Sequence, residues 1–345
     1  MPDVLEACKN ILVGCMGLSP DETVLVVTDT DKEDIGRAIA QAASGLGADA
    51  VMMTMRPRRV NGEEPPPSVA VAMAASGVVL CPTSKSLTHT QARAVAARAG
   101  ARIATMPGIT ADMLYAGAMT ADYTAVSQLT LRVKEILDKA RCARIEYRGR
   151  VLTLGLEGRT AVASTGRFLK PGESGNLPSG EAYIAPVEGT AEGILYVDGS
   201  VAGLGRVKAP IEVVVSGGRA QKFRDLEWDR TCPAEGEEGG SRSGATDAPH
   251  PFLGESGSAG ELGRLLNTPE ARNVAELGIG TNDRARLTGV ILEDEKIHGT
   301  VHVAFGDNST FGGKVKAGIH VDFIMLKPDL YLDDDPIIKA GRFVI

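Results

Sequence analysis

The chain has 345 residues, of which 43% are hydrophobic and 23% charged, and its formal net charge is −7. This composition is typical of a folded globular protein, and the acidic balance argues against a nucleic-acid partner, because phosphate binding needs concentrated Lys and Arg. No apolar run reaches the roughly 18 residues needed to cross a bilayer, so no membrane partner is expected. The N-terminus lacks the pattern of a secretory leader, and the five cysteines are scattered, as is typical of reduced thiols. We therefore expect a cytoplasmic protein.

A chain of this length predicts two domains. Its first part alternates strand-like and helix-like segments. Strands are expected at 23–29, 50–55, from 77 and from 101, and helices at 32–46, 68–76, 90–98, 109–116 and 121–140. Such alternation predicts a mostly parallel sheet covered by helices, and the nearly continuous apolar strands fit a sheet buried on both faces. The fold class of residues 1–142 is therefore an α/β N-terminal domain.

Beyond residue 142 the chain consists of short β-like runs separated by Gly and Pro turns. We expect residues 143–345 to form an α+β, β-rich C-terminal domain that binds metal and carries the catalytic site. The segment at about 233–260 is dense in Gly, Ser, Glu and Pro, so it is predicted to be a flexible insertion. Helix should resume near 258–266.

Two short runs near the end of the chain contain candidate metal ligands, namely His302, His320 and Asp322. In an extended chain alternate side chains share a face, so His320 and Asp322 project together. Turn residues separate the two runs and allow them to form a hairpin that gathers the three side chains. A buried hydrogen-bonded pair is the simpler reading of His320 and Asp322. We favour a metal site because of the neighbouring motifs.

Two further carboxylates, Glu181 and Glu276, interrupt apolar strands. A buried carboxylate needs a partner, which is either a metal cation or an arginine such as Arg284 or Arg286. A mixture of three carboxylates and two imidazoles suits two divalent ions, which together activate water and polarise a carbonyl. Zinc, cobalt and manganese all accept such ligands.

Two other features have simpler interpretations. His89 follows an apolar strand, so it lies either at the cleft between the domains or at the start of the next helix. The charged run from Glu293 to Lys296 is interpreted as a solvated turn.

Several phrases resemble the aminopeptidase T family of metallopeptidases, in the family's order and over most of the chain. They are CPTSKSLTHTQAR, ARIATMPGITADM, NLPSGEAYIAPVEGTAEG, VAELGIGTN, GTVHVAFGDN and IHVDFI. The resemblance implies a homodimeric aminopeptidase that removes N-terminal residues from short peptides. It also implies that two metals are bound by Glu181, Glu276, His302, His320 and Asp322. The family's tyrosine ligand is replaced here by Ser309, and no general base is assigned.

The same superfamily includes dioxygenases that open dihydroxypyridine rings with one iron held by two histidines and a carboxylate. His302, His320 and Asp322 can supply such a triad, so a mononuclear Fe(II) dioxygenase acting on a hydroxylated heteroaromatic is the alternative. Because a one-iron site has no use for both Glu181 and Glu276, the dinuclear aminopeptidase is the main hypothesis. A protein without catalytic activity is the third possibility.

Overall fold

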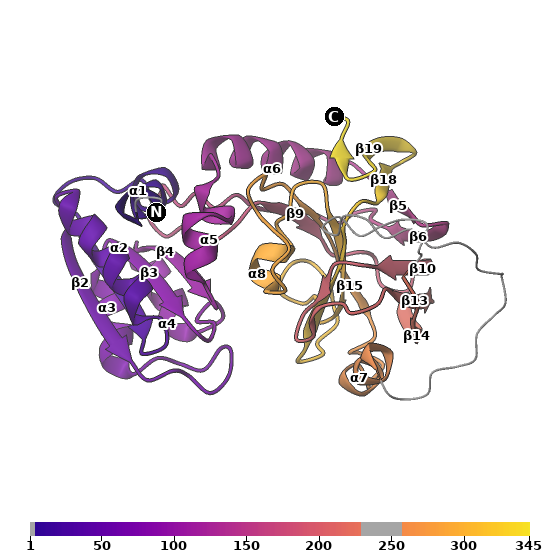
Figure 1. Cartoon of the computed structure of the whole chain (residues 1–345), viewed down its shortest axis with the longest axis horizontal. Coiled ribbons are helices and arrows are strands. Elements are labelled where there is room, and N and C mark those ends of the chain that lie inside the picture. Colours follow the sequence, from indigo (N-terminus) through magenta and orange to yellow (C-terminus); the bar gives the residue numbers. More distant parts are fainter. Residues whose placement is uncertain (1–3, 229–256) are drawn as a thin grey trace, which may run out of the picture.

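The first lobe of the molecule is built on a five-stranded parallel sheet with the order β2-β1-β3-β4-β8. The structure is a computed structural model, which describes residues 4–228 and 257–345, and Figure 1 shows two lobes side by side. The strands are β1 (Thr23–Asp29), β2 (Asp49–Met55), β3 (Val78–Thr83), β4 (Arg102–Pro107) and β8 (Ser174–Asn176). The expected α/β domain with a mostly parallel sheet is confirmed.

Helices cover both faces of this sheet. They are α1 (Val4–Lys9), α2 (Glu33–Gly45), α3 (Pro67–Ala75), α4 (Gln91–Arg98) and α5 (Ala111–Tyr115), with two short helical segments η1 (Asn10–Cys15) and η2 (Ala118–Thr120). Alternate residues of β1 enter different apolar clusters: Val24 and Val26 pack in one, Leu25 and Val27 in the other. Successive side chains of a strand point to opposite faces, so the sheet is buried on both sides, as its continuous apolar strands indicate.

The second lobe contains two antiparallel sheets, which confirms its β-rich character. The first has the order β14-β13-β10-β6-β5-β18-β19-β20 and the second the order β12-β11-β17-β16-β15-β9-β7. The strands of the first sheet are β5 (Cys142–Tyr147), β6 (Arg150–Gly155), β10 (Glu192–Val197), β13 (Ile211–Ser216), β14 (Arg219–Asp225), β18 (Asp329–Leu332), β19 (Asp335–Lys339) and β20 (Arg342–Phe343). Those of the second are β7 (Val162–Ser164), β9 (Glu181–Ile184), β11 (Ser200–Val201), β12 (Gly205–Arg206), β15 (Val274–Gly280), β16 (Val301–Gly306) and β17 (His320–Met325).

One apolar core joins these two sheets. It contains Leu152 and Leu154 from the first sheet together with Val303 and Phe305 from the second. Because side chains alternate along a strand, the even-numbered residues of β16, including His302, lie on the face of the second sheet that is turned away from this core. That face carries the candidate metal ligands.

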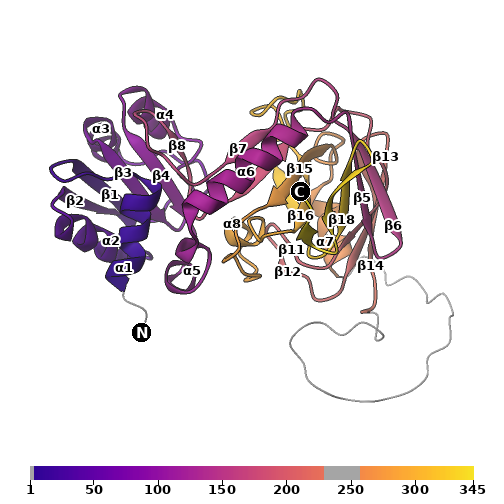
Figure 2. The ribbon, with the colours of Figure 1, turned by 90° about the horizontal axis from the view of Figure 1, so that it is seen from above.

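A long helix, α6 (Tyr123–Leu137), connects the lobes, and Figure 2 shows it running from one to the other. Its first residue, Tyr123, packs in a core cluster of the first lobe, whereas Val133 and Leu137 pack in the core of the second. The Asp122 side chain caps the helix by accepting hydrogen bonds from the backbone N–H groups of Thr124 and Ala125. The helix is therefore a shared structural element of both lobes.

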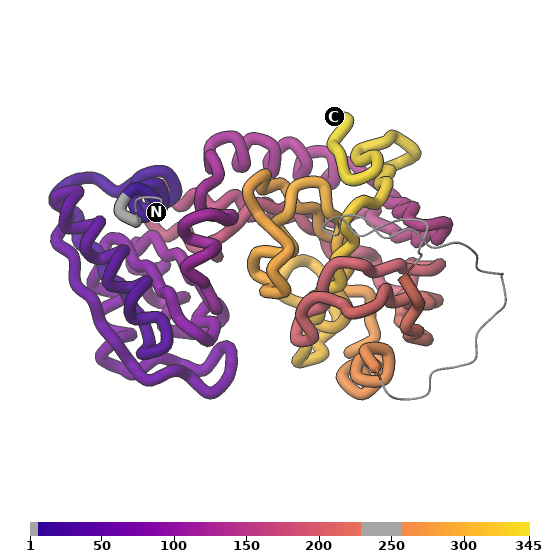
Figure 3. Tube along the Cα trace, viewed as in Figure 1, coloured from indigo at the N-terminus to yellow at the C-terminus, as the bar shows by residue number. Residues whose placement is uncertain are grey.

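The chain also crosses between the lobes at β8, which lies beyond residue 142 yet pairs with β4 of the first sheet. The tube in Figure 3 follows this return, and the C-terminus lies in the second lobe. The division at residue 142, where β5 begins, stays a prediction. The helix expected near 258–266 is confirmed as α7 (Ser258–Leu265), and a further short helix, α8 (Ile291–Asp294), precedes β16.

The predicted insertion at about 233–260 lies largely outside the described residues. Among the helices of the described residues, none has the length and apolar character needed to cross a membrane.

Candidate metal centre

The hairpin predicted from the two histidine runs is present. Strands β16 and β17 pair antiparallel, with Ala304 opposite Asp322 and Gly306 opposite His320. His302 shares the face of Ala304 and Gly306 because the period of a strand is two residues. The Nε2 atom of His320 lies 3.3 Å from Oδ1 of Asp322. The alternation in the sequence therefore predicted the face of the sheet correctly.

Glu276 joins this group from the neighbouring strand β15. A bulge after Val274 sets Glu276 opposite Ala304, which in turn pairs with Asp322. The two Glu276 carboxylate oxygens lie 3.2 Å from Nε2 of His302 and 3.5 Å from Nε2 of His320. Ligand atoms of Glu276, His302 and Asp322 all lie within 4.8 Å of one another. Four of the five predicted ligands thus converge.

The glycine opposite His302 makes room for its ring. Gly278 pairs with His302 across β15 and β16, and a β-carbon on Gly278 would lie 1.9 Å from Nε2 of the imidazole. No real side chain fits at that distance. The glycine therefore serves the site by its lack of a side chain.

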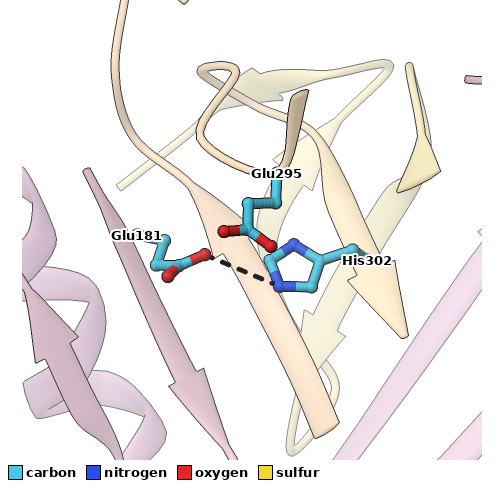
Figure 4. A group of neighbouring side chains, drawn as sticks. All are labelled: Glu181, Glu295 and His302. Carbon is cyan, nitrogen blue, oxygen red and sulfur yellow. Dashed lines mark ion pairs between the residues drawn. The ribbon is translucent and has the colours of Figure 1, made fainter. Parts of the chain in front are cut away.

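The fifth predicted ligand, Glu181 on β9, has a different partner. Its Oε1 atom accepts a hydrogen bond of 2.5 Å from Nζ of Lys296, while its Oε2 atom lies 3.7 Å from Nε2 of His302. Lys296 also forms an ion pair with Glu295. Figure 4 shows the side chains of Glu181, Glu295 and His302 pointing toward one another. The cation beside Glu181 is therefore a lysine, and neither of the two arginines considered above.

The interpretation of Glu293 to Lys296 as a solvated turn is wrong. Glu293, Asp294 and Lys296 are buried. Glu293 accepts a hydrogen bond from the backbone of Ala118 in the first lobe. Composition alone gave no sign of this, because a short run of charges looks the same in sequence whether its partners are water molecules or distant protein groups.

Serine at position 309 stabilises a turn. Its hydroxyl donates to Oδ1 of Asp307 (2.8 Å), and the main-chain oxygen of Asp307 lies 2.8 Å from Nδ1 of His320. A carbonyl oxygen can only accept, so Nδ1 donates in that contact, and Nε2 is the nitrogen of His320 that can bind a metal. The turn therefore orients the second imidazole.

The carboxylates strongly favour the protonated imidazoles. Burial opposes the charged form of His302, but the hydrogen bond to Glu276 and the charges of nearby acids outweigh it and raise its pKa to about 9. The pKa of His320 rises to about 10 against the same effect of burial, mainly through Asp322. Burial raises the pKa of Asp322, yet His320 and His302 lower it to about 2. A buried group of carboxylates thus attracts cations.

This donor set fits a divalent metal. It offers imidazole nitrogen and carboxylate oxygen within a small buried volume. An excess of buried negative charge is costly unless a cation compensates it. Protons on His302 and His320 compensate it in the absence of metal.

Aromatic side chains lie beside the ligands, and this aromatic border was not predicted from the sequence. The rings of Tyr183 and Phe311 meet edge to face with centroids 5.4 Å apart, and Phe311 meets the ring of His320 in the same way at 5.9 Å. Tyr183 is two residues beyond Glu181 on β9, so alternation could have placed it on the same face. The position of Phe311 depends on the fold of the turn and has no comparable signal.

His89 of the first lobe also belongs to this region. Burial, Arg93 and then the positive charge of His320 lower its pKa, so His89 is near enough to His320 for their charges to interact. The side chain that caps α4 is Thr90, which accepts a hydrogen bond from the backbone of Arg93. His89 is therefore not the capping residue, and its position at a cleft between the domains stays a prediction.

A buried cluster of imidazoles and carboxylates is typical of metal-binding proteins, and comparisons with known proteins assign the chain to a family. A family model for 2,5-dihydroxypyridine 5,6-dioxygenase matches residues 3–224. The chain belongs to this family. A curated 2,5-dihydroxypyridine 5,6-dioxygenase from Pseudomonas putida KT2440 is 26% identical over 193 residues, and the match covers 53% of this chain and 48% of that protein. The aligned region thus spans about half the length of the curated relative.

Two solved structures share the fold. The 2,5-dihydroxypyridine dioxygenase of Pseudomonas putida KT2440 superposes with a TM-score of 0.74 at 18% identity, covering 99% of this chain and 96% of the other. Aminopeptidase T of Thermus thermophilus superposes with a TM-score of 0.67 at 17% identity, covering 99% of each chain. The resemblance to aminopeptidase T is therefore confirmed at the level of a shared fold.

The aminopeptidase hypothesis is wrong. The matching family and the curated relative are 2,5-dihydroxypyridine 5,6-dioxygenases, and this finding contradicts the expected hydrolase activity and the short peptide as substrate. Lys296 supplies a cation to Glu181, and ligation of a metal by Glu181 stays a prediction. Binding of a divalent metal is supported by the family and by the ligand groups. The homodimer and the cytoplasmic location stay predictions.

Proposed function

We propose that the chain is a ring-cleaving dioxygenase that acts on a dihydroxypyridine and uses one Fe(II) held by His302, His320 and Asp322. The observation that carries this proposal is the convergence of two imidazoles and a carboxylate on one face of a hairpin in a chain of this family. Two histidines and a carboxylate are the donor set of many non-haem iron oxygenases. Glu276 contributes a further oxygen between the two imidazoles.

The protein holds these donors in place before metal arrives. Iron(II), when bound, supplies the one-electron and dioxygen chemistry that protein side chains lack. The contact between Nδ1 of His320 and the Asp307 carbonyl orients one imidazole, and Gly278 leaves room for the other. The excess of carboxylates favours a cation over an anion at this position.

The aromatic border fits a flat substrate. Phe311 is partly exposed and stands beside His320, with Tyr183 behind it. Aromatic faces and edges pack favourably against another ring, and such side chains line most small-molecule sites. We assign to Phe311 the role of packing against the pyridine ring of the substrate.

The proposed reaction balances without a further co-reactant. The bond between carbons 5 and 6 of the ring breaks, each of these carbons gains one oxygen atom of the same dioxygen molecule, and the substrate is oxidised as dioxygen is reduced. No external reductant is consumed. Uptake of dioxygen and loss of substrate must therefore be equimolar.

That equality is the experimental test. Protein loaded with Fe(II) without air is mixed with 2,5-dihydroxypyridine in aerated buffer, and both reactants are followed. The proposal predicts equimolar consumption, its loss in His302→Ala, and its retention in His298→Ala, because the exposed His298 packs against Phe343 instead. An iron-loaded protein that consumes neither reactant would overturn the proposal.

A further inference from the structure

We propose that the ammonium group of Lys296 occupies the second cation position of this centre, so that the protein binds one divalent ion and not two. The inference rests on the proposed metal centre, but it does not depend on which reaction the centre performs. Lys296 is thereby a positioning residue, since it acts on the ligands and is not assigned any contact with substrate.

The described residues contain two groups able to hold a metal, and the groups share one member. One consists of Glu276, His302 and Asp322, and the other of Glu181, Glu295 and His302. Nε2 of His302 lies closer to Glu276, at 3.2 Å, than to Glu181, at 3.7 Å. A nitrogen lone pair binds one ion. Once His302 serves the first group, the second offers Glu181 and Glu295, and a metal bound there would complete its coordination with water.

Those two carboxylates are the ones that Lys296 contacts. Its Nζ atom lies 2.5 Å from Oε1 of Glu181 and forms a second ion pair with Glu295. The lysine is 1% exposed, so water does not compete for its charge. Figure 4 shows the two carboxylates on the same side of the imidazole. The ammonium thus supplies the cation that the second group would otherwise take from solution.

The backbone around Lys296 fixes this arrangement. The N–H group of Lys296 donates to the Glu293 carbonyl (2.9 Å), and its carbonyl accepts from the Asn282 N–H (2.8 Å). The segment lies so close to β15 that a β-carbon on Gly280 would come within 2.1 Å of the Ile297 oxygen. These main-chain contacts fix where the side chain of Lys296 leaves the backbone, and the two ion pairs hold its Nζ atom.

A lysine differs from a metal ion in what it can do. It carries one charge, donates hydrogen bonds and has no open coordination position, so it cannot hold a bridging water between two ions as dinuclear hydrolases do. The ion pair with Lys296 gives the buried Glu181 carboxylate a partner in a centre that holds one metal.

Metal stoichiometry tests the inference. Metal-free protein is titrated with Co²⁺ by calorimetry, with the visible cobalt spectrum as a second readout. We expect one equivalent for the unmodified protein, two for Lys296→Met and one for Lys296→Arg. Lys134→Met is the matched control, because it removes a lysine of α6 that pairs with Asp138. It should also bind one equivalent of Co²⁺. A second equivalent in the unmodified protein, or its absence in a folded Lys296→Met variant, would overturn the proposal.

A second variant keeps the test valid if Lys296→Met does not fold. Glu181→Gln should bind one equivalent with an affinity within roughly 3-fold of the unmodified protein, because Glu181 is held by the lysine, whereas loss of a partner that supports the metal costs roughly 10-fold or more. A loss of that size in Glu181→Gln would overturn the proposal. None of these measurements uses dioxygen, so a failure of the dioxygenase proposal would leave their outcome unchanged.

Discussion

The imidazole of His302 lies against Gly278 on the neighbouring strand, so close that a β-carbon on the glycine would be 1.9 Å from Nε2. The same nitrogen lies 3.2 Å from Oε1 of Glu276, two residues earlier on the strand of the glycine. The missing side chain and the carboxylate together position the first imidazole of the centre.

Replacement of this glycine by alanine should therefore disrupt metal binding. In Gly278→Ala the ring of His302 must move, and we expect metal affinity to fall roughly 10- to 100-fold and stability to fall by about 1–3 kcal/mol from overpacking. Metal titration and thermal unfolding measure the two effects.

Gly263→Ala is the matched control for that change. Gly263 lies inside α7, and a β-carbon there meets nothing within 4 Å. Alanine should leave metal affinity unchanged and raise stability by about 0.5–1 kcal/mol, because alanine is the better helix former. Metal binding by Gly278→Ala equal to that of the control would contradict the account of the site.

The raised imidazole pKa values predict how metal-free protein responds to alkali. Because the pKa of His302 is about 9 and that of His320 about 10, their contribution to stability is complete below about pH 6.5 and is lost as pH rises through about 9–10. The lowered pKa of Asp322, about 2, contributes stability above about pH 4 that is lost in stronger acid. These three groups thus favour a stability maximum between about pH 4 and 6.5.

Metal should reverse the alkaline part of this dependence. Imidazoles must lose their protons to bind a metal, so affinity should rise with pH up to about 10 and binding should release protons. Thermal unfolding across pH, with and without Mn²⁺, shows whether the stability of metal-free protein falls and metal affinity rises as pH increases. Metal-free protein whose stability increases between pH 7 and 10, with no proton release on metal binding, would show that the histidines are already neutral.

The aromatic border predicts a separation of substrate binding from metal binding. Phe311→Ala should raise KM for the dihydroxypyridine roughly 10-fold, since an aromatic contact and its buried area are lost. Iron content should stay as in the unmodified protein. Phe343→Ala, which removes a ring that packs on His298, serves as the control with unchanged KM. An unchanged KM in Phe311→Ala would remove Phe311 from the substrate site.

Local patterns predicted the features of the fold that depend on local physics. Alternation placed His320 and Asp322 on one face, turn residues between the runs indicated the hairpin, and continuous apolar strands indicated the buried parallel sheet. All five candidate ligands were named from the sequence or through the resemblance, and four of them converge in the structure. Each of these predictions needs only the period of a strand or the chemistry of a turn.

The features of the fold and the site that were not predicted depend on contacts between distant parts of the chain. Lys296 meets Glu181 across 115 positions, and no periodicity indicates such a partner. The return of β8 to the first sheet and the position of Phe311 beside His320 are of the same kind. The run from Glu293 to Lys296 was interpreted as a solvated turn, so Lys296 was not considered as a partner of Glu181 when the carboxylates were taken to indicate two metals.

The dioxygenase proposal requires that both atoms of one dioxygen molecule enter the ring-opened product of a dihydroxypyridine. Turnover of iron-loaded protein with 2,5-dihydroxypyridine under ¹⁸O₂, followed by mass spectrometry of that product, measures this transfer. Two labelled oxygen atoms are expected in each product molecule. A product that takes its added oxygen from water, or no ring-opened product from iron-loaded folded protein, would overturn the proposal.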